Sequence, residues 1–324
     1  MKHLVIDETS KDQRLDRFLM KYLNKAGKSF IQKQIRLKKI KVNKKKAEPS
    51  TFLKLGDVVN IYMYDEKINE LREIESISSL DFKDLVFIYD DENLSILYKR
   101  EGLLVHAASK DDYGKNLLDK YVNYLIKNGE FIPRLSPTFT PAFCNRLDLN
   151  TRGLIIACKN YETLKKLNLS IKKRNIEKRY RTIVSGEVKA DRTIELTISK
   201  KNNKNMMEVS NDGKDCITEI FPIISKNGYT LLDINLITGR THQIRLSLSE
   251  IDHPIIGDRK YGKRIVNENL YDKYGLRNQY LIAYKLKFGD MEKGLEYLNN
   301  KEFKIDNIYY GEIEKKLLGD FYEL

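Results

Sequence analysis

The first 65 residues carry a hydrophobic pattern that predicts two helices and three short strands. Apolar residues recur at helical spacing on one face of 14–23, and a second helix is predicted over 30–36 after a break at Gly27. Alternation of apolar and polar positions predicts strands at 2–7, 40–43 and 56–63. Residues 66–83 are polar and acidic and contain several serines, so we interpret them as a linker.

Strand patterns dominate the rest of the chain, from residue 84 to 324. Strands are predicted at 85–90, 93–99, 102–106, 154–158, 178–184, 193–207, 216–224, 229–236 and 279–288. Helical spacing predicts helices at 116–127 and 161–174, and residues 238–245 are expected to form a turn that enters another helix. The pattern therefore indicates a domain over 1–65, a linker over 66–83 and a larger domain over 84–324.

Charge is distributed unevenly along the chain. The formal net charge is +13, and residues 1–65 hold 16 basic and seven acidic residues, a balance of +9. A polyanion such as RNA is the natural partner of this basic region, because each neutralised phosphate releases counterions and steers the encounter. A basic surface that serves only solubility remains the alternative.

Membrane, secretory and disulfide-rich classes do not fit the composition. No apolar run approaches the ~20 residues that cross a bilayer, and the first residues lack the apolar core of a signal peptide. Cys144, Cys158 and Cys216 are odd in number and widely spaced, without a C-x-x-C pair, so neither disulfides nor a zinc site are expected. We therefore predict a cytoplasmic protein.

The stretch that carries the candidate chemistry is C-N-R-L-D-L-N-T-R-G-L-I-I-A-C, residues 144–158. Its apolar run predicts a strand buried on both faces, so Asp148 falls on the loop that leads into this strand. Arg146, Arg152 and the arginines of T-G-R-T-H-Q-I-R, at 238–245, could converge on the same cleft. A carboxylate beside guanidinium groups stays ionised and oriented. Taken alone, a loop aspartate is more often a surface residue in a polar turn.

Three blocks resemble the RluA family of pseudouridine synthases. N-R-L-D-x-N-T-x-G-L, at 145–154, is similar to the family's signature, with Asp148 at the catalytic aspartate. G-R-T-H-Q-I-R followed by H-P-I-I-G-D-x-x-Y-G, at 239–262, resembles its second block, and K-R-Y-R-T-I-V-S-G, at 178–186, resembles the segment with its active-site tyrosine. Two residues depart from the pattern: Arg152 replaces a small serine, and Ser247 replaces a histidine.

The resemblance implies a fold and a set of roles. The fold would be α+β, with a mixed, largely antiparallel central sheet and flanking helices. Asp148 would be the catalytic carboxylate, Arg245 would hold it, and Tyr180 would pack against the uracil and relay the proton from C5. Arg146 would fill the gap left by the flipped base. His106 and His242 are interpreted as structural residues. The isomerisation involves no redox change, so no cofactor and no metal are expected.

A separate resemblance covers residues 12–65. The order of two helices, a strand, a turn and a G-D strand is similar to the RNA-binding domain first described in ribosomal protein S-four. That family grips structured RNA through its helical pair. The residues that would contact RNA are Arg14, Arg17, Lys28, Lys33 and Arg36. Each could equally be an ordinary solvated side chain.

The sequence thus predicts a monomeric RNA pseudouridine synthase. The resemblance to the family's domain arrangement implies large-subunit (23S) ribosomal RNA, or a pre-ribosomal particle, as substrate, with transfer RNA as the alternative. A non-catalytic RNA-binding or ribosome-assembly factor on the same scaffold is a rival interpretation. A glycosidase would need a second acid spaced from Asp148, and the sequence offers no credible partner.

Overall fold

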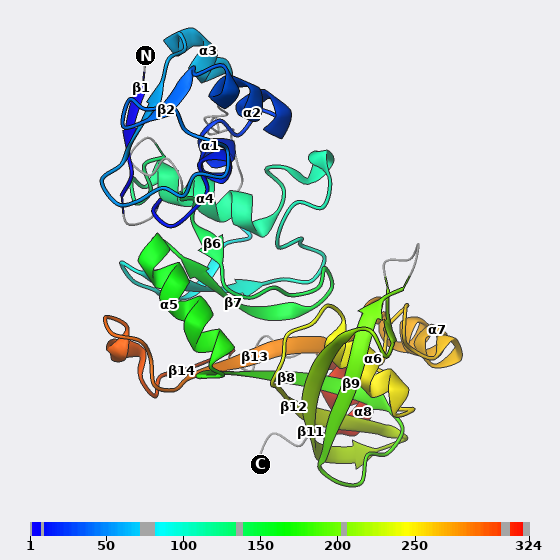
Figure 1. Ribbon diagram of the computed structural model, residues 1–324. Helices are drawn as coiled ribbons and strands as arrows, with labels where there is room; N and C mark the ends of the chain where they lie inside the picture. The colour runs from blue at the N-terminus through cyan, green and yellow to red at the C-terminus, as the bar shows by residue number, and fades with distance from the viewer. Residues whose placement is uncertain are drawn as a thin grey trace. The chain divides into compact units, whose positions relative to one another are not determined.

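Residues 2–7, 10–71, 82–133, 139–201, 206–305 and 312–319 are described by the computed structural model of the chain (Figure 1). They pack as two compact units, each of which is considered by itself. One unit comprises 1–80 with 122–141 and 160–162, and the other comprises 81–121, 142–159 and 163–324.

The N-terminal residues form a small three-stranded sheet with two packed helices. Antiparallel strands β1 (Lys2–Val5), β3 (Val58–Ile61) and β2 (Ile40–Val42) lie in the order β1-β3-β2. Helices α1 (Leu15–Tyr22) and α2 (Lys28–Arg36) bury the apolar faces that the periodicity predicts, with Phe18 1% exposed and Ile31 fully buried. The elements predicted for this region are confirmed.

The start of the predicted linker is helical. Helix α3 spans Asp65–Glu70, and Ile68, which is 3% exposed, joins the core of the N-terminal residues. Residues 72–81 lie outside the described part of the chain, so the domain boundaries at 65 and 84 stay a prediction.

A large mixed sheet organises the second unit. The strands of its described residues follow the order β10-β9-β11-β12-β8-β13-β7-β5-β4, while β14 pairs with β13 and β6 pairs with β7. Their bounds are β4 (Val86–Asp90), β5 (Leu94–Lys99), β6 (Ala142–Phe143), β7 (Arg152–Cys158), β8 (Ile176–Ser185), β9 (Arg192–Lys200), β10 (Met207–Val209), β11 (Lys214–Lys226), β12 (Tyr229–Leu236), β13 (Leu281–Phe288) and β14 (Glu302–Lys304). Among these pairs only β7 with β13 is parallel, which confirms a mixed, largely antiparallel sheet.

Both faces of this sheet are covered. On β7, Leu154 and Ile156 enter one core, while Ile155 enters the other, so the strand is buried on both faces as predicted. Helices α5 (Tyr161–Lys172), α7 (Arg264–Tyr274) and α8 (Glu312–Leu318) contribute to the first core, and α4 (Leu117–Lys127) and α6 (Gln243–Glu250) to the second. Two short 3-10 turns occupy Lys110–Asp112 and Glu296–Leu298.

The strand predicted at 102–106 is absent, and its backbone has other partners. The N–H of Gly102, at φ +76°, donates to the carbonyl of Leu149. The carbonyls of Leu104 and Val105 accept from the N–H groups of Leu117 and Leu118 at the start of α4. These bonds satisfy helix donors that have no partner within the helix, so the segment serves as a cap instead of a strand.

The strand predicted over 193–207 is divided. Strand β9 ends at Lys200 and β10 begins at Met207, and residues 202–205 lie outside the described ranges.

Cys144 and Cys158 are distant in sequence but come together where β6 pairs with β7, and their Sγ atoms are 3.1 Å apart. No helix in the described ranges is long and apolar enough to span a membrane.

Candidate active site

Asp148 lies on a tightly held loop that leads into β7. The side chain of Asn145 clamps this strand, donating to the carbonyl of Leu154 at 3.1 Å and accepting from the N–H of Ile156 at 2.8 Å. The N–H of Thr151 closes a turn onto the carbonyl of Asp148 at 3.1 Å. Leu147 is buried in the core below. The loop therefore has little freedom to redirect the carboxylate.

Lys99, at the end of β5, pins the same loop from within the protein. Its Nζ donates to the carbonyls of Leu149 at 2.9 Å, Thr151 at 2.8 Å and Arg100 at 3.0 Å, and its side chain is fully buried. Burial lowers the pKa of Lys99 to about 7, against the opposing influence of the charges on Asp148 and Glu101. Sequence reasoning assigned it no role, since a lysine at a strand end usually lies in solvent.

Gly153 allows β7 to lie against β13 directly after this loop. Its φ is +133°, and a Cβ built there would lie 2.3 Å from the carbonyl oxygen of Ala283 on β13. Any side chain would therefore both strain the backbone and separate the two strands. The T-x-G-L part of the motif is thus a packing requirement of the strand that follows Asp148.

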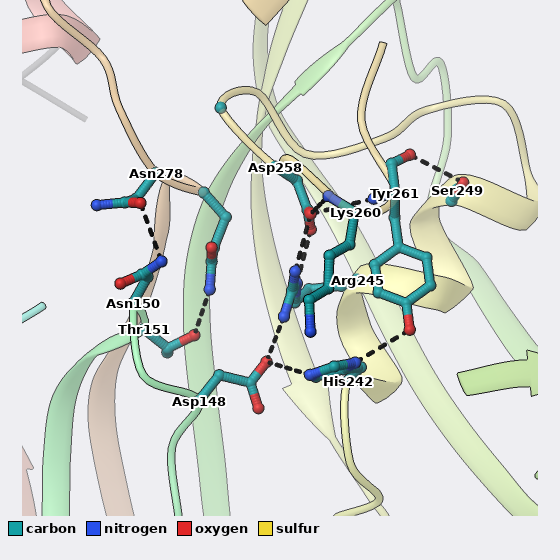
Figure 2. Close-up of polar contacts among 12 residues, drawn as sticks. Asp148, Asn150, Thr151, His242, Arg245, Ser249, Asp258, Lys260, Tyr261 and Asn278 are labelled. Carbon is teal, nitrogen blue, oxygen red and sulfur yellow. Dashed lines mark hydrogen bonds and ion pairs between the residues drawn. The ribbon is translucent and has the colours of Figure 1, made fainter. Parts of the chain in front are cut away.

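Arg245, on α6, bridges two carboxylates (Figure 2). Its Nη1 donates to Oδ2 of Asp148 at 2.9 Å, while Nε and Nη2 donate to the two oxygens of Asp258 at 2.6 and 2.8 Å. The side chains of Arg245 and Asp258 are 6% and 0% exposed, and that of Asp148 is 19% exposed. Asp258 therefore holds two of the guanidinium nitrogens, and the third, Nη1, donates to Asp148.

The electrostatics of the buried pair Arg245–Asp258 favour its ionised form. Burial alone would lower the pKa of Arg245, but the hydrogen bonds and charge of Asp258, with those of Asp148, raise it above its ordinary value. Burial opposes ionisation of Asp258, yet the hydrogen bonds and charge of Arg245 lower the pKa of that carboxyl. A buried, bidentate pair of this kind is strongly directional.

His242 approaches the same carboxylate oxygen of Asp148 as Arg245 does. It precedes α6 in the left-handed conformation, at φ 53°, and its Nε2 lies 3.9 Å from Oδ2 of Asp148. Its Nδ1 is 3.0 Å from the hydroxyl of Tyr261. Burial lowers the pKa of His242 below the ordinary histidine value, with Asp148 opposing the shift, so the ring is neutral near pH 7. The contact is therefore polar but not an ion pair.

These groups face a cavity of about 470 Å³. Asp148 comes from the loop before β7, Tyr180 from β8 and Arg245 from α6, and all three line it together with Arg146, His106 and Lys178. Tyr180 is 5% exposed, and burial, reinforced by the charge of Asp148, raises the pKa of its hydroxyl. The phenol of Tyr180 thus stays protonated at the wall of the cavity.

Comparisons with known proteins identify the family of the chain. A family model described as RNA pseudouridylate synthase matches residues 93–250, and one described as S4 domain matches residues 13–59. Ribosomal large subunit pseudouridine synthase C of Buchnera aphidicola is 31% identical over 297 residues, covering 88% of each chain. An uncharacterized RNA pseudouridine synthase of Mycoplasma genitalium is 32% identical, covering 89% of each chain. The chain belongs to the RNA pseudouridine synthase family.

Solved structures support the same fold for this pseudouridine synthase. Human RNA Pseudouridylate Synthase Domain Containing 1 superimposes with a TM-score of 0.56 at 17% identity, covering 74% of this chain and 91% of its own. Human RNA Pseudouridylate Synthase Domain Containing 4 gives a TM-score of 0.53 at 20% identity, covering 68% of this chain and 88% of its own. The family and fold predicted from the sequence motifs are therefore confirmed.

The predicted RNA-contacting residues of the S4 domain differ in their surroundings. Arg17 on α1 and Lys28, Lys33 and Arg36 on α2 are exposed. Arg14 instead forms a bidentate pair with Asp16, from Nε to Oδ1 at 3.0 Å and from Nη2 to Oδ2 at 2.8 Å. Arg14 is thus partly engaged in holding the start of α1, whereas the other four are displayed to solvent.

The two departures from the family motif leave the cavity of the synthase intact. The guanidinium of Arg152 lies 5.3 Å from the centre of the Tyr280 ring in a cation–π contact, and Arg152 does not line the cavity. Ser247 is fully buried in α6, with its hydroxyl 3.4 Å from that of Thr218. Within the described ranges, no three His, Cys, Asp or Glu side chains are grouped so that they could hold a metal ion.

Proposed function

We propose that Asp148, Arg245 and Tyr180 form the catalytic set of this RNA pseudouridine synthase. The reaction breaks the bond from N1 to the ribose C1′, turns the freed uracil and joins C5 to C1′, so C5 loses a proton and N1 gains one. A carboxylate can attack a carbon centre, take a proton from the sugar or stabilise positive charge at C1′. The 2.9 Å contact between Asp148 and Arg245 at the cavity wall is the observation that carries this proposal.

Tyr180 and Arg245 have complementary tasks in this scheme. The protonated phenol of Tyr180 packs against the uracil and relays the proton that leaves C5. Arg245, fixed by Asp258, holds the carboxylate of Asp148 at the cavity wall.

The target uridine has to leave its stack before Asp148 can reach its sugar. Extrusion of a base costs roughly a few kcal/mol. Arg146 is exposed and lines the cavity two residues before Asp148, so it is placed to occupy the space that the base vacates. Its planar guanidinium can stack on the neighbouring bases.

We further propose large-subunit ribosomal RNA (23S rRNA), free or in a pre-ribosomal particle, as the substrate of a monomeric, cytoplasmic enzyme. A relative that shares 88% of its length with this chain is named a ribosomal large subunit pseudouridine synthase. The S4 domain adds exposed cations that suit structured RNA. One chain supplies all three catalytic residues, so a second copy is not needed to complete the site.

The rival functions fit less well. A glycosidase needs a second catalytic carboxylate, but Asp258 is fully buried behind Arg245 and does not line the described cavity. RNA binding by a non-catalytic assembly factor would not require Asp148, Tyr180 and Arg245 to line one cavity.

The decisive experiment uses unmodified transcripts of large-subunit rRNA and of transfer RNAs, incubated with the full chain and mapped by carbodiimide treatment and primer extension. New stops at defined uridines of the large-subunit transcript, absent with Asp148→Ala, are expected. The variant should retain RNA affinity, because the carboxylate contributes no attraction to phosphate. Modification of transfer RNA alone would replace the substrate assignment, and binding without new stops in any transcript would favour the assembly factor.

A further inference from the structure

A second cavity adjoins the catalytic one. It measures about 710 Å³ and shares Arg146 and the turn Gly239–His242 with the catalytic cavity. Its other walls come from the ends of β9 and β11 and from Met206 and Met207 at β10. The two hollows therefore meet at the turn that carries His242, beside Asp148.

Cations dominate the lining of the second cavity. Lys200, Lys214, Arg240 and Arg146 lie on it, against the single acid Asp212. Lys200 and Lys214 are exposed, and among the described residues no acid forms an ion pair with either of them or with Arg240. Unpaired cations that converge on one hollow next to a nucleic-acid active site suit a phosphate group.

The same cavity also offers an apolar, polarisable wall. Met206 and Met207 are half-buried, and Met207 packs against a small core that contains Ile198. Thioether side chains make favourable contacts with aromatic rings and adapt to their shape. A base can therefore lie on the methionines while its phosphate faces the lysines.

Hydrogen bonds from the rest of the protein fix this wall in place. The N–H of Met207 donates to the hydroxyl of Tyr261 at 2.7 Å, and the same hydroxyl lies 3.0 Å from Nδ1 of His242. The cavity is thus preformed, and one tyrosine ties its β10 wall to the turn beside Asp148. Preformed sites bind without a cost for ordering their walls.

We propose that the second cavity binds the nucleotide next to the target uridine in the RNA strand, its phosphate on Lys200 and Lys214 and its base on Met206 and Met207. The proposal rests on the catalytic cavity receiving the flipped uridine. Because the RNA strand is continuous, a uridine in the first cavity places a covalently attached neighbour at its rim. The second cavity would then contribute to the choice of uridine through the identity of that neighbour.

The test uses a short RNA hairpin that carries a uridine mapped with the wild-type enzyme. Each of the two linkages that flank this uridine is prepared as phosphate or as uncharged methylphosphonate. The variant Lys200→Ala/Lys214→Ala is compared with Lys189→Ala/Lys287→Ala, which removes two exposed lysines outside both cavities. Thermal unfolding checks that each variant is folded.

The lysine pair in the cavity should lower kcat/KM about tenfold on the all-phosphate hairpin. On the hairpin with methylphosphonate at the linkage held by the cavity, the loss should be at most about twofold, and the control pair should change neither rate. An equal loss on every hairpin, or no loss on any of them, would overturn the proposal.

A binding measurement separates this proposal from the proposed function. If wild-type enzyme modifies no uridine in any transcript, the function fails, but pentauridylate binding at low salt still reports on the cavity. Weaker binding by Lys200→Ala/Lys214→Ala than by the control pair supports a nucleotide site. Equal affinity in the two variants contradicts it.

Discussion

The carboxylate of Asp148 and the guanidinium of Arg245 lie 2.9 Å apart, although 97 residues separate them along the chain. The contact depends on a third residue, because Asp258 occupies two of the three guanidinium nitrogens. Asp258 has no exposed side-chain surface and does not line the cavity. Its effect on the reaction is therefore indirect, through the residues it holds, of which Arg245 contacts Asp148.

Asp258→Ala should cost both stability and activity. Removing one partner of a buried pair leaves an uncompensated charge, which lowers the free energy of unfolding by about 3–5 kcal/mol. The freed Arg245 can then turn away from Asp148, so kcat should fall while RNA affinity is retained. Urea unfolding and single-turnover rates measure the two effects.

Glu268→Ala is the matched control for this prediction. Glu268 pairs with Arg264 at 3.4 Å, but the two side chains are 60% and 87% exposed. An exposed pair contributes less than about 1 kcal/mol. Equal losses in the two variants would mean that Asp258 does not act through burial and its bond to Arg245.

Lys99 should give the protein a pH-dependent stability above neutrality. The pKa of Lys99 is lowered to about 7, whereas the pKa of a lysine in the unfolded chain is about 10.4. Between these values the unfolded chain binds a proton that the folded chain does not, so the free energy of unfolding rises with pH. The slope is at most about 1.4 kcal/mol per pH unit.

Lys99→Met removes this titration. The difference in unfolding free energy between wild type and variant should grow from about pH 7 to about pH 10. It should stay constant below about pH 7. Urea unfolding at several pH values measures it. A difference that does not change over the whole range would show that Lys99 keeps its ordinary pKa, held charged by the carbonyls of Leu149 and Thr151.

The loop with Asp148 and the strand after it were predictable because their signals are local. The apolar run 154–158 follows a glycine, and no distant residue is needed to see that it is buried. The segment 102–106 shows the limit of such reasoning. Its apolar residues do belong to the core, but whether its carbonyls join a ladder or cap α4 depends on residues 117 and 118.

The roles of the residues that support the site could not be predicted from the sequence for the same reason. Asp258 lies within a quoted motif, yet its task depends on meeting Arg245 in three dimensions. Lys99 looks like a surface lysine until the carbonyls of Leu149 and Thr151 surround it. The sequence motifs contain both aspartates. Only the tertiary structure shows which carboxylate faces the cavity and which lies behind the arginine.

Tyr180→Phe should slow the chemical step and leave RNA affinity unchanged. The variant keeps the ring that packs against the uracil but loses the hydroxyl that would relay the C5 proton. Loss of such a proton-transfer group lowers the rate of the chemical step by about 10²–10⁴-fold. Release of tritium from RNA labelled at C5 of uridine measures the step directly. Tyr284→Phe loses a hydroxyl bonded to Asp233 outside the cavity and should retain full activity. Full activity in Tyr180→Phe would restrict Tyr180 to packing.

The exposed cations of the S4 domain should set the salt dependence of RNA binding. Replacing Arg17, Lys28, Lys33 and Arg36 with alanine removes four positive charges, while Arg14 is left to hold Asp16. If each charge neutralises one phosphate of a duplex region, the slope of log affinity against log salt should flatten by about 3–4. Replacing four exposed lysines of the other unit, Lys189, Lys273, Lys287 and Lys304, provides a charge-matched control. Equal flattening in both variants would show that RNA senses only net charge and would remove the special role of the helical pair.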